Sequence, residues 1–239
     1  MTAKKVSILV FVAVAVVAVG IGSAKWFTRS DVVAQPAPPA EDRGPVIATV
    51  DGAPIYLAEV RSRVSGLTSV HGGTLEQALG TGWKDELFQS LVDDQIVQRQ
   101  AGALGITVSD SDARKHVDKI AAMFQTEQGY SDWLSSNNMS EAQLLTRVRL
   151  QTLASLLYLK VTETAAPTAA EVRGYFEDHR QDYLGVDGKP APLIAVKDQI
   201  NKNLEKKARD LAYAEWLKNQ RGAVKVVVID PTWWRGLGS

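Results

Sequence analysis

Two short runs that favour β-strand stand at opposite ends of the part of the chain that can form a globular core. Val46–Val50 alternates apolar and small residues before an Asp51-Gly52 turn, and residues 223–230 form a continuous, β-branched run. A lone strand leaves its backbone hydrogen-bonding groups unpaired, so each run needs a partner strand. We therefore predict that Val46–Val50 pairs with residues 224–229 in a small two-stranded sheet, which brings the two ends of the domain together.

The sequence between these runs is dominated by helical periodicity, which predicts a mainly α fold. Apolar residues recur every three or four positions, and residues 153–159 are apolar on nearly every side, as in a helix surrounded by others. Helix starts are marked where Ser109, Ser140 or Thr168 precedes Asp, Gln or Glu by three residues, the pattern of a capping box. Residues expected on the buried helix faces include Val60, Val64, Leu87, Leu91, Val92, Ile96, Val117, Leu144, Val148, Leu159, Val172, Phe176, Ile200, Leu204, Leu211 and Trp216.

The first 31 residues predict a membrane-directed segment. Two lysines precede an uncharged apolar run over residues 6–22, and basic residues follow it. As a helix this run would span roughly 26 Å, close to the ~30 Å hydrocarbon core of a bilayer. We predict an uncleaved, single-pass signal anchor in the inner (cytoplasmic) membrane; the alternative is a signal peptide cleaved near Gly22 and Ala24. In either case the C-terminal domain should lie in the periplasm or another extracytoplasmic space.

The rest of the chain divides into a linker, one domain and a tail. Residues 32–45 are rich in proline, which fixes φ and removes backbone donors, so they should form an extended linker. Residues 46–230 carry the strand and helix patterns, and residues 231–239 form a C-terminal tail. The absence of cysteine and a formal net charge of zero exclude a disulfide scaffold and a strongly charged nucleic-acid binder.

No pattern for catalysis or metal binding is present. The histidines, His71, His116 and His179, lie in different predicted elements without HExxH spacing, which argues against a zinc site. The GxSxG, P-loop and GxGxxG patterns are absent, and the basic residues of 197–221 alternate with acids as on a solvated helix face. We expect no catalytic residue, cofactor, metal or nucleic-acid partner.

Aromatic and methionine side chains gather around one polar stretch that we expect to be a loop. Such side chains can line an adaptable groove for apolar peptides, because methionine repacks easily and aromatic rings carry much apolar area; core packing is the alternative. A second pair, Trp233 and Trp234, would either dock onto the body of the domain or contact a partner. The candidate client-binding residues are Met123, Phe124, Tyr130, Trp133 and Met139.

The order of these elements resembles that of exported folding factors of the SurA and PrsA type. The passages that carry the resemblance are VDGAPIYLAEV, then LVDDQIVQRQA with GITVSDSDA, and then PTAAEVRGYFEDHRQDY. The resemblance covers residues 46–229. It implies a helical chaperone domain, like the SurA N-terminal domain, that grips unfolded, apolar polypeptide without ATP. One departure is Tyr56, which stands where the family often has a Ser or Thr cap for the first helix.

The larger departure is a short connector. Many relatives carry a parvulin-type prolyl isomerase domain after the helix that ends in YFEDHRQDY, but here only about ten residues, near 184–192, precede the next helical pattern. Independent folding below about 40 residues generally needs disulfides or metals, so no such domain fits. We expect a membrane-anchored, exported, ATP-independent chaperone for unfolded polypeptides. The alternatives are a peptidyl-prolyl cis-trans isomerase and a dedicated assembly or scaffold subunit of an envelope or secretion system.

Overall fold

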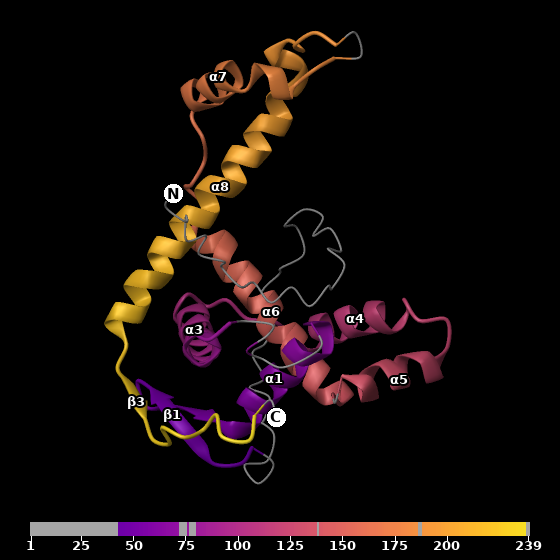
Figure 1. Ribbon diagram of the computed structural model, residues 1–239, viewed down its shortest axis with the longest axis vertical. Helices are drawn as coiled ribbons and strands as arrows, with labels where there is room; N and C mark the ends of the chain where they lie inside the picture. Colours follow the sequence, from indigo (N-terminus) through magenta and orange to yellow (C-terminus); the bar gives the residue numbers. More distant parts are fainter. Residues whose placement is uncertain (1–42, 72–75, 77–79, 138, 186–187, 238–239) are drawn as a thin grey trace. The chain divides into compact units, whose positions relative to one another are not determined.

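The computed structural model describes residues 43–71, 76, 80–137, 139–185 and 188–237 (Figure 1). The chain forms two compact units. The first contains the chain up to Gln95 with Thr107–Thr152 and Lys225–Ser239, and the second contains Ile96–Ile106 and Leu153–Val224. The predicted anchor and most of the predicted linker, residues 1–42, lie outside the described residues. Within the described part of the chain, no helix combines the length and the apolar character needed to cross a membrane.

A small antiparallel sheet in the first unit joins the first and last strands of the described chain (Figure 1). Ala48 pairs with Val228, which confirms the predicted pairing of the chain ends. The predicted count of two strands is wrong, because Asp51 and Gly52 adopt φ values of 48° and 86° and turn the chain back as a third strand. The strands lie in the order β2-β1-β3 and are β1 (Val46–Val50), β2 (Ala53–Tyr56) and β3 (Val226–Val228).

Helices make up most of the remaining described chain, so the mainly α prediction is confirmed. Two helices, α3 and α6, contribute residues to both units. A short 3-10 turn, Arg180–Asp182, follows α7. The α-helices are α1 (Leu57–His71), α3 (Trp83–Ala103), α4 (Asp110–Ala121), α5 (Glu127–Ser136), α6 (Glu141–Val161), α7 (Ala169–Asp178) and α8 (Leu193–Ala223).

The predicted caps are present at the starts of α4, α6 and α7. Ser109 Oγ accepts a hydrogen bond from the Asp112 N–H at 3.1 Å, and the hydroxyl of Ser140 serves α6 in the same way. At α7 the capping box is complete, since Thr168 and Glu171 each accept from the other's backbone N–H. These bonds satisfy donors that a helix start otherwise leaves unpaired, so each helix begins where its cap predicts.

One predicted loop is partly helical. The polar stretch after α4 contains α5, whose N-cap is Thr126; its Oγ1 accepts from the Gly129 N–H at 3.0 Å. Helix α8 begins at Leu193, directly after Pro192, at the end of the connector predicted near residues 184–192. Proline suits a helix start, where its fixed φ and missing N–H cost nothing.

The helix faces predicted to be buried are largely so, with two exceptions in the second unit. Helix α8 buries different faces along its length. Leu211 lies on the same face as Ile200 but is 64% exposed, whereas Tyr213, on nearly the opposite face, is buried. Leu159 is 43% exposed, so residues 153–159 are not enclosed on every side. The predicted residues found buried are Val60, Val64, Leu87, Leu91, Val92, Ile96, Val117, Leu144, Val148, Val172, Phe176 and Ile200.

Candidate functional site

Three aromatic rings from the predicted client site come together in the first unit, where α5 lies beside α4 (Figure 1). The ring of Phe124 lies 5.7 Å from that of Tyr130 and 5.5 Å from that of Trp133, centre to centre. Tyr130 and Trp133 stack at 6.2 Å, because residues three apart on a helix share a face. We call Phe124, Tyr130 and Trp133 the aromatic cluster. Helix α5, which the sequence analysis missed, fixes its geometry.

The two methionines of the predicted site have different surroundings. Met139 is buried in a core with Val117, Leu144 and Val148, and Tyr130 and Trp133 pack against that core. Met123, which precedes Phe124 in the chain, is 60% exposed. Of the five candidates, Met139 is therefore a core residue beneath the aromatic cluster. The three rings are half-buried, and the side chain of Met123 is exposed to solvent.

Charges lie around the aromatic cluster and not within it. Arg114 on α4 pairs with Glu141 at the start of α6. The hydroxyl of Tyr130 is buried, with no hydrogen-bond partner among the described residues, and its burial raises the pKa of Tyr130, as does the nearby Glu141 carboxylate. The phenol is therefore neutral at physiological pH, and the cluster can recognise a ligand through apolar area and ring faces.

The tryptophans of the C-terminal tail are placed differently from each other. Trp233 is buried; its ring meets Trp83 edge-on at 6.5 Å and stacks on Phe88 at 6.1 Å, both on α3. Trp234 is half-buried, and Lys84 Nζ lies 3.5 Å from the centre of its ring. The tail is thus docked through Trp233, which is not available to a partner in this structure. Trp234 is the member of the pair that solvent reaches.

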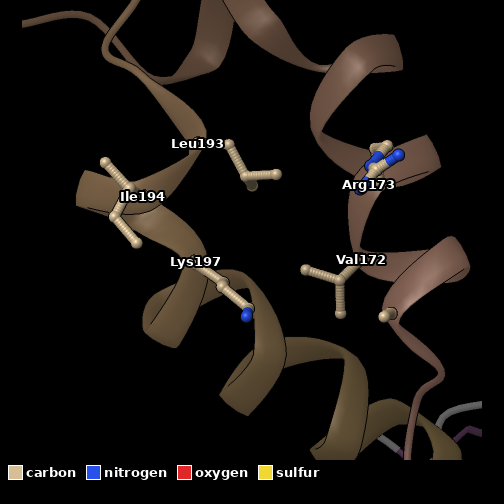
Figure 2. Close-up of a pocket in the computed structure, with 6 residues that line it drawn as sticks. Val172, Arg173, Leu193, Ile194 and Lys197 are labelled. Carbon is tan, nitrogen blue, oxygen red and sulfur yellow. The ribbon is translucent and has the colours of Figure 1, made fainter.

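A pocket of about 350 Å³ lies in the second unit between α7 and the start of α8 (Figure 2). In Figure 2, Val172 on α7 and Leu193 and Lys197 on α8 line the space between the two helices. Val172 belongs to a buried cluster with Phe176 and Ile200, which forms the base of this helix pair. No pocket was predicted here, because periodicity marks Val172 as a buried residue but does not show which helix lies opposite it.

The connector between α7 and α8 closes on itself. The Ala191 N–H donates to the Tyr183 carbonyl at 2.8 Å, and Leu184 and Pro190 form an antiparallel bridge. The ends of the connector therefore lie side by side. This is the geometry at which an inserted domain can be present or absent while the flanking helices keep their positions.

No metal centre is formed by the residues that the structure describes: nowhere do three His, Asp or Glu side chains gather closely enough to hold an ion. The Nδ1 atom of His116 lies 2.8 Å from the Asp112 carbonyl oxygen in α4, and that of His179, the residue after α7, lies 2.8 Å from the Tyr175 carbonyl oxygen. Those two histidines are therefore engaged locally. The side chain of His71 lies outside the described part of the structure.

Comparison with known proteins identifies one family and relatives that are named as a foldase or as chaperones. A family model described as the SurA-like N-terminal domain matches residues 2–157. Over 104 residues the chain is 23% identical to the foldase protein PrsA of Clostridium acetobutylicum, a match that covers 42% of this chain and 31% of that relative. The match therefore spans about a third of that relative's length.

A solved structure shares the fold. It comes from work on PEB4 and Cj1289 of Campylobacter jejuni, which are described as structurally related SurA-like chaperones. The TM-score is 0.51 at 13% identity, and the alignment covers 77% of this chain and 98% of that chain. The resemblance to SurA- and PrsA-type proteins stated from the sequence is confirmed, and the described chain has a SurA-like fold.

Proposed function

Because the chain belongs to the SurA-like N-terminal domain family, we propose that it is a membrane-anchored, extracytoplasmic chaperone that binds unfolded polypeptide without ATP and assists the folding of exported proteins. The observation that carries the proposal is the aromatic cluster with Met123 exposed beside it in the chain. The apolar run over residues 6–22, flanked by basic residues, supports the anchor. An anchored holdase of this kind would meet its clients as they leave the membrane.

Binding at the aromatic cluster would draw on burial of apolar client surface, at about 25 cal/mol per Å² removed from water. Methionine and aromatic side chains suit this task because a flexible thioether and neutral ring faces accept many apolar shapes. Release needs no nucleotide: when the client buries the same apolar surface in its own core, folding competes with binding. The proposal therefore requires modest affinity and broad selectivity.

The test is suppression of the aggregation of chemically denatured citrate synthase by the full chain in detergent micelles. We expect Met123→Lys to raise the chaperone concentration needed for half-maximal suppression about 3- to 10-fold. The substitution replaces an exposed apolar contact with a charge, and about 1.4 kcal/mol of lost binding free energy is a factor of ten. Light scattering after dilution of the denatured protein measures the effect.

The matched control is Leu104→Lys, which makes the same kind of change at a residue that is 50% exposed in the second unit. It should leave the suppression of aggregation within twofold of wild type, a bound that reflects the small effect of most surface changes. The site assignment is rejected if both variants behave alike. The chaperone proposal itself is rejected if the wild-type chain, at several-fold molar excess, leaves aggregation unchanged.

The chief rival is a prolyl isomerase, and the length of the connector favours the holdase over it. Residues 179–192 span the whole interval between α7 and α8, and part of this interval is used in a closed hairpin. We expect the full chain to give no acceleration of cis–trans exchange in a proline peptide, a reaction that takes tens to hundreds of seconds uncatalysed at 25 °C. Two-dimensional exchange NMR of the peptide measures this rate, and a clear enhancement would support the isomerase.

A further inference from the structure

The three-stranded sheet has two outer edges, and one of them is blocked. The Ile229 N–H donates to the Ile47 carbonyl at 2.8 Å and the Asp51 N–H to the Lys225 carbonyl at 2.9 Å, so odd-numbered residues of β1 turn their backbone groups toward β3. Thr49 is one of these, and its partner in β2 is Pro54. Two opposed residues of an antiparallel pair either bond to each other or both direct their backbone groups away from each other. Thr49 directs its groups toward β3, so the backbone nitrogen of Pro54 faces the outer edge of β2. As a proline nitrogen it has no hydrogen to donate there.

The β3 edge is open. By the same alternation, Val227 turns its backbone groups toward β1, whereas Val226 and Val228 turn theirs away from it. Neither position is a proline, and no described strand lies on that side of β3. The side chains of Val226, Val228 and Ile229 are 38%, 47% and 56% exposed, and Val227 is 42% exposed. The edge therefore presents unpaired donors and acceptors with apolar side chains on both faces.

Such an edge is complementary to one chemistry, an extended polypeptide backbone with apolar side chains. A second copy of this chain fits poorly as a stable occupant, because a three-residue strand spans only about 10 Å, whereas a specific interface usually buries about 800 Å² per partner. A short contact made by main-chain hydrogen bonds suits weak binding without sequence preference. That is the behaviour expected of a client segment.

We propose that the outer edge of β3 binds an extended, apolar segment of an unfolded client as an added strand. This inference rests on the proposed chaperone function and assigns it a second contact besides the aromatic cluster. Backbone pairing at the edge would hold the client chain extended, while the aromatic cluster takes apolar side chains. The Pro54 edge of the same sheet cannot pair in this way, so a client strand can add on one side only.

The test uses Val228→Pro in the full chain. Because the Val228 N–H faces away from β1, proline removes the outward donor while the hydrogen bonds between β3 and β1 are kept. Val228→Ala is the matched control, since it shortens the side chain and retains the donor. The probe is a fluorescein-labelled decapeptide of alternating Thr and Val, measured by fluorescence anisotropy with empty detergent micelles as the blank.

We expect wild type to bind this peptide, Val228→Pro to weaken binding at least tenfold, and Val228→Ala to weaken it less than threefold. A peptide of the same sequence, N-methylated at four consecutive central residues, should not bind, because methylation blocks both of its edges. Amide exchange at Val226 and Val228 should slow when the unmodified peptide is added, while Val227, already bonded to β1, should change little. Val226→Pro and the methylated peptide keep the inference testable if Val228→Pro fails to fold.

The inference is overturned if wild type does not bind the peptide, if the methylated peptide binds equally well, or if the proline variants match Val228→Ala. Aggregation suppression is measured on the same samples. Suppression without peptide binding rejects the edge site and leaves the proposed function standing. Peptide binding without suppression supports the edge site and rejects the proposed function.

Discussion

Trp233→Ala is expected to lower the free energy of unfolding by about 3–5 kcal/mol, the usual cost of replacing a buried tryptophan by alanine. Trp233 is 7% exposed and joins the C-terminal tail to α3 through ring contacts with Trp83 and Phe88. Alanine would leave a cavity between the tail and the helix. Urea denaturation of the full chain in detergent micelles, followed by far-UV circular dichroism, measures the loss without relying on tryptophan emission.

Trp234→Ala is the matched control, because it removes the same side chain from the neighbouring position. Trp234 is half-buried, and its ring lies against the cations of Lys84 and Arg235, contacts that contribute about 0.5–1 kcal/mol each at exposed sites. We expect this variant to lose less than about 1.5 kcal/mol. Equal losses in the two variants would mean that Trp233 does not anchor the tail, and the pair would then be free to dock a dedicated partner.

Ile200→Ala is expected to cost about 2–5 kcal/mol in the second unit. Ile200 is 0% exposed and packs with Val172 and Phe176 between α7 and α8. Truncation would open a cavity at the contact that holds α7 to the long helix. The same denaturation experiment measures the loss, and faster amide exchange along α7 would locate it.

Ile194→Ala is the control for this prediction, since it makes the same chemical change on the same helix at a side chain that is 81% exposed. Its cost should stay within about 0.5 kcal/mol, because little apolar area is removed from a packed site. If Ile200→Ala also falls within that range, α7 and α8 do not share the core described here. The pocket beside Val172 would then have no rigid base.

Local signals in the sequence were sufficient for the helix starts. A cap is a contact between residues three apart, so Ser109 with Asp112 and Thr168 with Glu171 are visible without any knowledge of the fold. The pairing of β1 with β3 was also predictable, because a strand needs a hydrogen-bonding partner and a second strand-forming run lies at the far end of the chain. The Asp51-Gly52 pair is itself a typical hairpin signal, although only a turn after the first strand was predicted there.

The site was predictable only where its members are neighbours in the sequence. Phe124, Tyr130 and Trp133 lie within ten positions and form one cluster, although the helix that arranges them was missed. The separation of Met123 from Met139 into exposed and buried side chains could not be predicted, since both are apolar residues beside a polar stretch. Met139 is buried by Val117 on α4 and by Leu144 and Val148 on α6.

By itself, then, the sequence determined the family, the helical character, the capped helix starts and the closure of the chain ends, because each depends on short-range chemistry or on an unpaired backbone. The tertiary structure decided which faces are covered. Helix α8 buries Ile200 near one end and Tyr213, on the opposite face, further along, and only Trp233 of the tryptophan pair is buried. Which backbone groups of β3 remain open depends on the register of β3 against β1. Each of these follows from the position of a distant partner, which no local pattern encodes.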